Sequence, residues 1–328
     1  MGTDTLTYSV SHRTTLRYTE KVSLSYNEVR MRPRDRGSQR TLAFSMLSTP
    51  WAVPRSRIDY FGNYVHRLDV TTPHDVLEFT VDAVVENTEP RRRRLQEWEG
   101  DALASDPRLE FALPSPRVPL YHSTRSLWQD WNGTDRSFDG VLATAQRIPR
   151  ELRYVSGATT VESSIDDLLA GGAGVCQDFT HLFLAMVRGA GWPARYVSGY
   201  PGPVNEEGVV EGQSHAWVEV CGADGRWVGL DPTLGEYVGA HHLRLAVGRD
   251  YGDVAPHHGL FFGAATGAPP EVSVRVARMS SQQVDKVDYH AAVHWQQQQQ
   301  QQSWCADGRP GAKRPGAPRG RRVCAGGR

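Results

Sequence analysis

The sequence predicts an α+β protein in which an N-terminal antiparallel β-sandwich precedes a core of helices and strands. Two observations carry this prediction. Short segments rich in β-branched and aromatic residues recur between turn signals over residues 4–88. Beyond residue 120, helical periodicity alternates with strand-like segments. We therefore divide the chain into a β-sandwich domain (1–95), a core (96–290) and a Gln-rich, basic tail (291–328).

The N-terminal domain is predicted from strands that combine apolar and polar residues, as half-buried strands do. About six strands at this spacing, divided by turns such as Gly62-Asn63 and Pro73-His74, indicate an antiparallel sandwich. No pattern in this part is typical of a catalytic site. The predicted strands are residues 6–10, 15–18, 22–31, 40–47, 56–60, 64–71 and 77–86.

The core is predicted to open with helices. A run of four arginines, residues 91–94, is interpreted as a solvated connection between the domains rather than as a binding patch. Residues 121–131 and 138–153 then show helical spacing. In the second of these segments, apolar residues such as Val141 and Ile148 fall on one face.

A glycine-rich loop followed by a cysteine provides the first catalytic candidate. Residues 164–169 predict a short helix that is capped by Ser164 and ends at Gly171-Gly172. Cys176 then begins a long amphipathic helix. Helix N-terminal N–H groups stabilise a thiolate, and glycines let a substrate approach the backbone closely. We interpret Cys176 as a nucleophile, since a structural cysteine would more often lie within the apolar face of the helix.

A nucleophilic cysteine needs a base, and a predicted hairpin provides one. Residues 214–220 alternate as a strand, residues 222–225 form a turn, and residues 226–230 form the partner strand. His215 begins the first strand and Asp231 ends the second, so both lie at the same end of the sheet. A carboxylate that orients an imidazole next to a thiol is the arrangement of a catalytic triad. The predicted catalytic residues are Cys176, His215 and Asp231.

Several neighbouring polar residues are given structural roles. Asp178 is interpreted as a stabiliser of the first helical turn, and His181 as a partly exposed helix residue. Residues 249–253 form a polar cluster that secures a loop near the site, and Cys221 receives no role.

Charge and composition restrict the partners. The chain of 328 residues has 37 Lys+Arg and 37 Asp+Glu, but the last 26 residues carry a net charge of +6 and residues 1–302 carry −6. The basic tail follows seven glutamines, residues 296–302, and its composition predicts disorder. We expect a solvated extension, with weak nucleic-acid contact through residues 303–328 as the alternative.

The sequence predicts neither a membrane partner nor a cofactor. No apolar run approaches the roughly 18–20 residues of a membrane-spanning helix, and the first residues lack the pattern of a secretory signal. The four cysteines form no C-x-x-C pair, so we expect a cytoplasmic protein without a disulfide framework. The histidine pairs His241-His242, His257-His258 and His290/His294 lack partners at a zinc spacing, so no metal is expected. The oligomeric state is not defined.

Four motifs surround the catalytic candidates: GVCQDF (174–179), PARYVSGY (193–200), HAWVE (215–219) and DPT (231–233). Three more lie elsewhere in the chain: RPR (32–34), FGN (61–63) and GRDYGDVAP (248–256). Together they resemble the motifs of the bacterial transglutaminase-like superfamily. The order Cys, His, Asp matches the triad of that family. The resemblance implies a papain-like core, in which the helix bearing Cys176 packs on an antiparallel sheet bearing His215 and Asp231. The N-terminal part is similar to the β-domain that precedes such cores.

The resemblance implies acyl transfer on peptide or protein amides through a thioester at Cys176. Animal transglutaminases follow the nucleophile with Trp-Val-Phe, whereas this chain has Gln177-Asp178-Phe179, and no acidic cluster resembles their calcium sites. Calcium dependence is therefore not implied. Hydrolysis of the same thioester, as in a cysteine protease or amidase, is the first alternative. A catalytically silent binding module and an interaction protein that acts through its basic tail are the others, and the second oxyanion donor is not identified.

Overall fold

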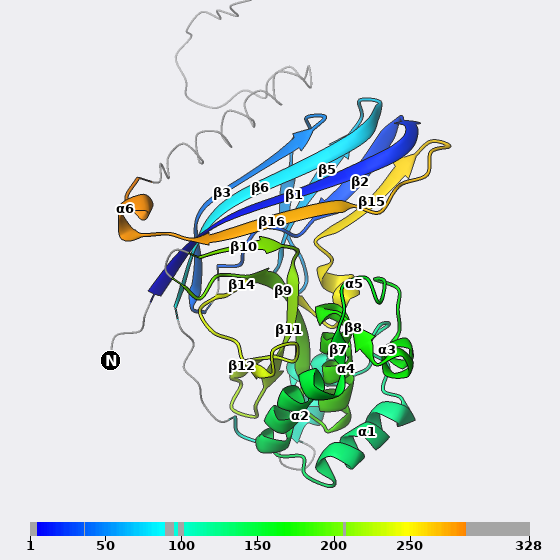
Figure 1. Cartoon of the computed structure of the whole chain (residues 1–328), viewed down its shortest axis with the longest axis vertical. Coiled ribbons are helices and arrows are strands. Elements are labelled where there is room, and N and C mark those ends of the chain that lie inside the picture. Colours follow the sequence, from blue (N-terminus) through cyan, green and yellow to red (C-terminus); the bar gives the residue numbers. More distant parts are fainter. Residues whose placement is uncertain (1–4, 36, 89–94, 98–101, 206–207, 287–328) are drawn as a thin grey trace, which may run out of the picture.

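The computed structural model describes residues 5–35, 37–88, 95–97, 102–205 and 208–286 (Figure 1). The sandwich strands lie at one end of the molecule and helices α1 to α4 at the other, with the core sheet beside these helices. The arginine run 91–94, the pair His290/His294 and the tail 291–328 fall outside the described residues. The predicted domain limits stay a prediction.

The sandwich consists of two antiparallel sheets, as predicted. One has the strand order β10-β16-β1-β6-β3 and the other β15-β2-β5-β4. Alternate residues of the long strands face the core between the sheets, for example Phe79 and Val81. The strands are β1 (Thr5–Val22), β2 (Leu24–Val29), β3 (Gln39–Thr49), β4 (Arg55–Ile58), β5 (Tyr64–Val70), β6 (His74–Thr88), β10 (Val209–Gly212), β15 (His257–Phe262) and β16 (Glu271–Arg278).

Strand β1 is one continuous strand where the sequence predicted two. The sequence predicted separate strands at 6–10 and 15–18, but one strand runs through both. The inward positions between them hold His12 and Thr14, which are polar and hide the alternation. Both are buried because the His12 ring bonds the Tyr200 hydroxyl at 2.7 Å and Thr14 Oγ1 at 3.0 Å.

The sandwich is assembled from chain segments that precede and follow the core in the sequence. Strand β16 pairs with β1 and β15 pairs with β2, although both strands follow the core in sequence. The short strand β10 leaves the core and adds to the edge of β16. Residues within the range 96–290 therefore complete the N-terminal sheets.

The core contains a five-stranded antiparallel sheet with the order β13-β12-β11-β9-β14. Helix α4 packs against it through β9 and β11 and is buried on all sides from Gln177 to Arg188. This agrees with the predicted helix-on-sheet arrangement. The strands are β9 (Ala194–Pro201), β11 (His215–Cys221), β12 (Trp227–Asp231), β13 (Glu236–Tyr237) and β14 (His242–Gly248), and α4 is Cys176–Gly189.

The predicted helices of the core are confirmed. Ser164 caps α3 in a capping box with Asp167, and Gly172 ends that helix in the left-handed region with φ 61°. Buried residues of α2 include Val141 and Ile148. The remaining elements are η1 (Ala102–Ser105), η2 (Pro107–Ala112), α1 (His122–Asn132), α2 (Phe138–Glu151), β7 (Arg153–Tyr154), α3 (Ile165–Gly171), β8 (Ala173–Gly174), α5 (Tyr251–Val254) and α6 (Ser281–Val284).

Three amide side chains of the sandwich domain bind the outer edge of the core sheet, and we call Gln39, Asn63 and Asn87 the amide ladder. Gln39 accepts from Arg244 N at 2.7 Å and donates to Arg244 O at 2.8 Å. Asn63 does the same for Val247, both at 2.8 Å. Asn87 donates to the carbonyls of residues 240 and 242 at 2.9 and 3.1 Å. The ladder thereby satisfies backbone groups that the edge strand β14 would otherwise leave unpaired.

Among the residues that the structure describes, no helix has both the length and the apolar character required to cross a bilayer.

Candidate active site

Cys176 is the first residue of helix α4, and a short parallel pair of strands, β7 and β8, leads into it. Asp178 confirms its predicted role, because its Oδ2 accepts from Val175 N at 2.8 Å and from the Thr159 hydroxyl at 2.5 Å. Gly174 leaves no space for a side chain, since a Cβ there would lie 2.7 Å from the Leu168 side chain and 2.8 Å from Asp178. The backbone before Cys176 is therefore tightly packed at Gly174, where only a glycine fits.

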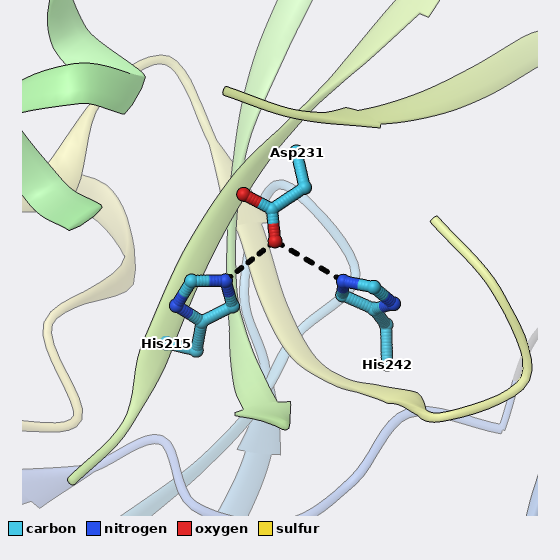
Figure 2. A group of neighbouring side chains, drawn as sticks. All are labelled: His215, Asp231 and His242. Carbon is cyan, nitrogen blue, oxygen red and sulfur yellow. Dashed lines mark hydrogen bonds and ion pairs between the residues drawn. The ribbon is translucent and has the colours of Figure 1, made fainter. Parts of the chain in front are cut away.

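The hairpin of β11 and β12 brings His215 and Asp231 together. Val218 pairs with Leu230, so the start of β11 and the end of β12 lie at the same end of the sheet. His215 Nε2 lies 2.6 Å from Asp231 Oδ2 (Figure 2). This contact leaves Nδ1 of the ring for Cys176, whose side chain also hydrogen-bonds to His215. The structure thus joins the three predicted residues in the order Cys176, His215, Asp231.

His215 and Asp231 stabilise each other's charged form. Burial lowers the pKa of His215, but the hydrogen bonds and charges of Asp231 and Cys176 outweigh burial and raise it to about 10. For Asp231, burial raises the pKa, yet the hydrogen bonds from His215 and His242 hold it well below its ordinary value. At neutral pH the site therefore contains an imidazolium beside a buried carboxylate.

Asp231 has a second histidine partner that the sequence did not predict. His242 Nε2 lies 3.2 Å from the same Oδ2, and Figure 2 shows the carboxylate between the two imidazole rings. The other oxygen, Oδ1, accepts from the backbone N–H groups of Thr233 at 2.8 Å and Leu234 at 3.3 Å. The sequence indicated His241-His242 only as a pair. The contact depends on how β14 pairs with β9, and no local pattern in the sequence indicates that pairing.

Within the described part of the chain, two groups of side chains place their ligand atoms close enough to hold a metal ion: His215, Asp231 and His242, and Glu236, His241 and His242. A histidine nitrogen binds a metal through a lone pair. His242 Nδ1 already accepts from Gly239 N at 3.2 Å, so Nε2 carries the proton and donates it to Asp231. Both groups would need a nitrogen of His242 that is committed to a hydrogen bond, so these residues fit a metal poorly.

Cys176 and His215 open onto a cleft of about 650 Å³ between the core and the sandwich. Polar and aromatic residues of both domains line it, and His12 and His257 come from the sandwich side. Strand β10 forms one wall and continues through Gln213 and Ser214 to His215. A substrate at Cys176 would therefore contact both domains.

Two tyrosines of this cleft stay protonated. Burial, followed by the charge of Cys176, raises the pKa of Tyr196 well above its ordinary value. The same two causes in the same order raise the pKa of Tyr154. A phenol donates a hydrogen bond, so both residues offer donors to negative charge that develops near Cys176. The sequence pattern did not separate them from core tyrosines.

Of the remaining predicted residues, His181 requires a correction and the cluster 249–253 is confirmed. His181 is buried, not partly exposed: it accepts from Tyr251 N at 3.3 Å, and burial lowers its pKa to about 4. The cluster 249–253 secures its loop through the pair Arg249–Asp253 at 2.9 Å and through Asp250, which accepts from Arg117 N at 3.0 Å. Cys221 bonds Arg108 and lies outside the cleft lining.

The chain is similar to known protein families over both of its domains. Residues 8–86 match the family described as the bacterial transglutaminase-like N-terminal region, and residues 125–232 match the transglutaminase-like superfamily. The second match includes all three residues of the candidate triad.

Two relatives are similar over most of their length. The uncharacterized protein ML0607 of Mycobacterium leprae is 33% identical over 277 residues, which cover 83% of this chain and 98% of that protein. Rv2569c of Mycobacterium tuberculosis is 32% identical over 305 residues, which cover 82% and 92%. A solved structure of a candidate cysteine protease from Cytophaga hutchinsonii superposes with a TM-score of 0.67 at 24% identity, covering 85% of this chain and 92% of that one. The last similarity shows the fold.

Proposed function

The chain belongs to the transglutaminase-like superfamily, and we propose that it is a cysteine-dependent acyltransferase that acts on peptide or protein amides through a thioester at Cys176. The observation that carries the proposal is the 2.6 Å contact of His215 with buried Asp231, together with the bond from His215 to Cys176. An imidazolium with a pKa of about 10 stabilises a thiolate beside it at neutral pH.

In the first step, the sulfur of Cys176 attacks the carbonyl carbon of a substrate amide. The carbonyl oxygen becomes negative, and the backbone N–H of Cys176 and a cleft phenol, Tyr154 or Tyr196, stabilise it. When the C–N bond breaks, His215 donates its proton to the departing amine. The products of this step are a thioester at Cys176 and a free amine or ammonia.

In the second step, neutral His215 takes a proton from the incoming nucleophile, which attacks the thioester carbon and releases the Cys176 thiolate. A primary amine gives a new amide, and water gives a carboxylic acid. Asp231 holds Nε2 throughout, so Nδ1 faces the reacting atoms. The proton that His215 lost in the first step returns in the second.

Hydrolysis is the second candidate function. The specific observation in its favour is the size of the cleft, because about 650 Å³ leaves room for water beside an acyl group. The fold neighbour from Cytophaga hutchinsonii, described as a candidate cysteine protease, supports the same outcome. Both functions share the thioester and differ in the acceptor.

The two functions separate in one experiment. A pool of glutamine-containing peptides is incubated with the protein and a labelled primary amine and then analysed by mass spectrometry. We expect amine incorporation for transfer, and deamidation or chain cleavage for hydrolysis. Cys176→Ala should abolish every product, whereas Cys221→Ala, a matched change at a buried cysteine that lies outside the cleft lining, should preserve them. Equal product formation by wild type and Cys176→Ala would refute the proposal.

A further inference from the structure

His242 is the part of the site that the two steps above do not use. It lies on β14, which pairs with β9 and not with the β11–β12 hairpin that carries His215 and Asp231. Its side chain is buried and donates to Asp231 Oδ2 at 3.2 Å. We propose that His242 is a positioning residue for the reaction, which fixes the Asp231 carboxylate and through it the ring of His215. The inference rests on the proposed cysteine chemistry.

The hydrogen bonds define which proton His242 offers. Nδ1 accepts from Gly239 N at 3.2 Å, so the proton of the neutral ring is on Nε2 and points at Asp231. The ring cannot reverse this arrangement without placing two N–H groups against each other at Gly239. His242 is therefore a donor of fixed direction and not a second base.

The arrangement around Asp231 shows why a second donor matters. Backbone N–H groups of Thr233 and Leu234 hold Oδ1, and they belong to the turn that directly follows Asp231. On the other side, Oδ2 accepts from His215 and His242, which approach from different strands. Without His242, only the movable ring of His215 would hold Oδ2. Fixing both oxygens keeps Nε2 of His215, and hence its Nδ1, in one orientation.

The sandwich domain sets the position of His242. Asn87 on β6 donates to the carbonyl oxygen of His242 at 3.1 Å and to that of Ala240 at 2.9 Å. Contacts therefore run from Asn87 through His242 and Asp231 to His215. The place of the sandwich domain against the core is in this way linked to the direction of the catalytic ring.

The test compares two substitutions of similar size. His242→Gln keeps an N–H donor for Asp231 and an oxygen acceptor for Gly239, whereas His242→Met fills the space without a donor. The assay is the rate of Cys176 alkylation by iodoacetamide in the full chain, measured by intact mass from pH 5.5 to 9.5. This readout needs no substrate. His122→Ala is the control, because His122 is exposed at the start of α1 and is not among the residues that line the cleft.

We expect His242→Met to slow alkylation roughly tenfold at pH 6.5 and to approach wild type at pH 9.5, where thiols ionise without help. His242→Gln should recover most of the rate, and His122→Ala should match wild type. Equal rates for His242→Met and wild type, or for His242→Met and His242→Gln, would overturn the inference. A wild-type rate no faster than that of a free thiol would instead refute the proposed function itself.

Discussion

Substitution of Asp231 by asparagine tests the charge arrangement of the site directly. In the wild type, the two carboxylate oxygens accept from four N–H donors, two on the backbone and two on imidazole rings. Asparagine has the same shape but only one oxygen. Whichever way its amide turns, an N–H group faces either Thr233 and Leu234 or the two histidines. The variant therefore loses the negative charge and also gains a conflict between donors.

The magnitude follows from His215. With a pKa of about 10, its ring is an imidazolium throughout the neutral range. In Asp231→Asn, burial still lowers the pKa of His215, and only the interactions with Cys176 still raise it. The ring then becomes neutral near pH 7, and the cysteine loses its cation. An ordinary thiol is only about 1% thiolate at pH 6.5, and a more basic thiolate is the better nucleophile. Alkylation at pH 6.5 should therefore slow by a factor on the order of 30 to 100.

The assay is iodoacetamide alkylation of Cys176 from pH 5.5 to 9.5, followed by intact mass. We expect the wild type to react faster than Asp231→Asn at pH 6.5, and the difference between the two rates to shrink as the pH rises toward 9.5, where ordinary thiols ionise. The matched control is Asp224→Asn in the turn of the same hairpin, where the carboxylate pairs with Arg226. Because loss of one partner of a buried pair costs about 3–5 kcal/mol, a thermal melt must show that the variant is folded at the assay temperature. A rate within threefold of wild type at pH 6.5 would refute the reasoning.

Two further predictions concern stability. Gly199→Ala should lower the unfolding free energy by about 3 kcal/mol, because a Cβ on β9 would overlap the Trp217 ring and the carbonyl of Leu243. Gly212→Ala, where nothing lies within 4 Å of the added atom, is the control, and equal melting temperatures by circular dichroism would contradict this. The unfolding free energy should decrease as the pH is lowered from 6.5 to 5. The reason is that burial lowers the pKa of four histidines to about 4: His12, His66, His181 and His257. These rings stay neutral in the folded state but bind protons below pH 6.5 when unfolded, at a cost of up to about 1.4 kcal/mol per pH unit for each. The raised pKa of His215 does not contribute there, because its stabilisation is complete below pH 6.5 and is lost only toward pH 10. Urea denaturation at pH 7, 6 and 5 measures the slope, and a constant unfolding free energy would rule the effect out.

The parts of the site that the sequence predicted depend on short-range signals. Cys176 follows a glycine-rich loop and begins an amphipathic helix, and a tight turn joins the strands that carry His215 and Asp231. Each of these signals lies within a few residues, and the folded chain has the local structure that it predicts. The sandwich strands likewise follow local alternation, except where buried His12 and Thr14 interrupt the apolar pattern of β1.

His242 could not be predicted because its contact with Asp231 depends on packing between distant segments. It reaches Asp231 only because β14 pairs with β9 and because Asn87, far away in the sequence, holds the carbonyl of residue 242. The pairing of β15 and β16 with strands of the N-terminal sheets likewise joins segments that are far apart in the sequence. Alternation within a strand indicates which of its faces is buried, but it does not indicate which distant strand will pair with it.

The amide ladder has a consequence for how this protein can be divided. A fragment limited to the catalytic half would expose β14 with the N–H and C=O groups of Arg244 and Val247 open, and such an edge recruits strands from other molecules. No single cut avoids this, since β15 and β16 follow the core yet complete the sandwich. Removal of β1 to β6, or of β15 and β16, should therefore cause self-association and precipitation. We therefore expect the sandwich and the core to fold as a unit.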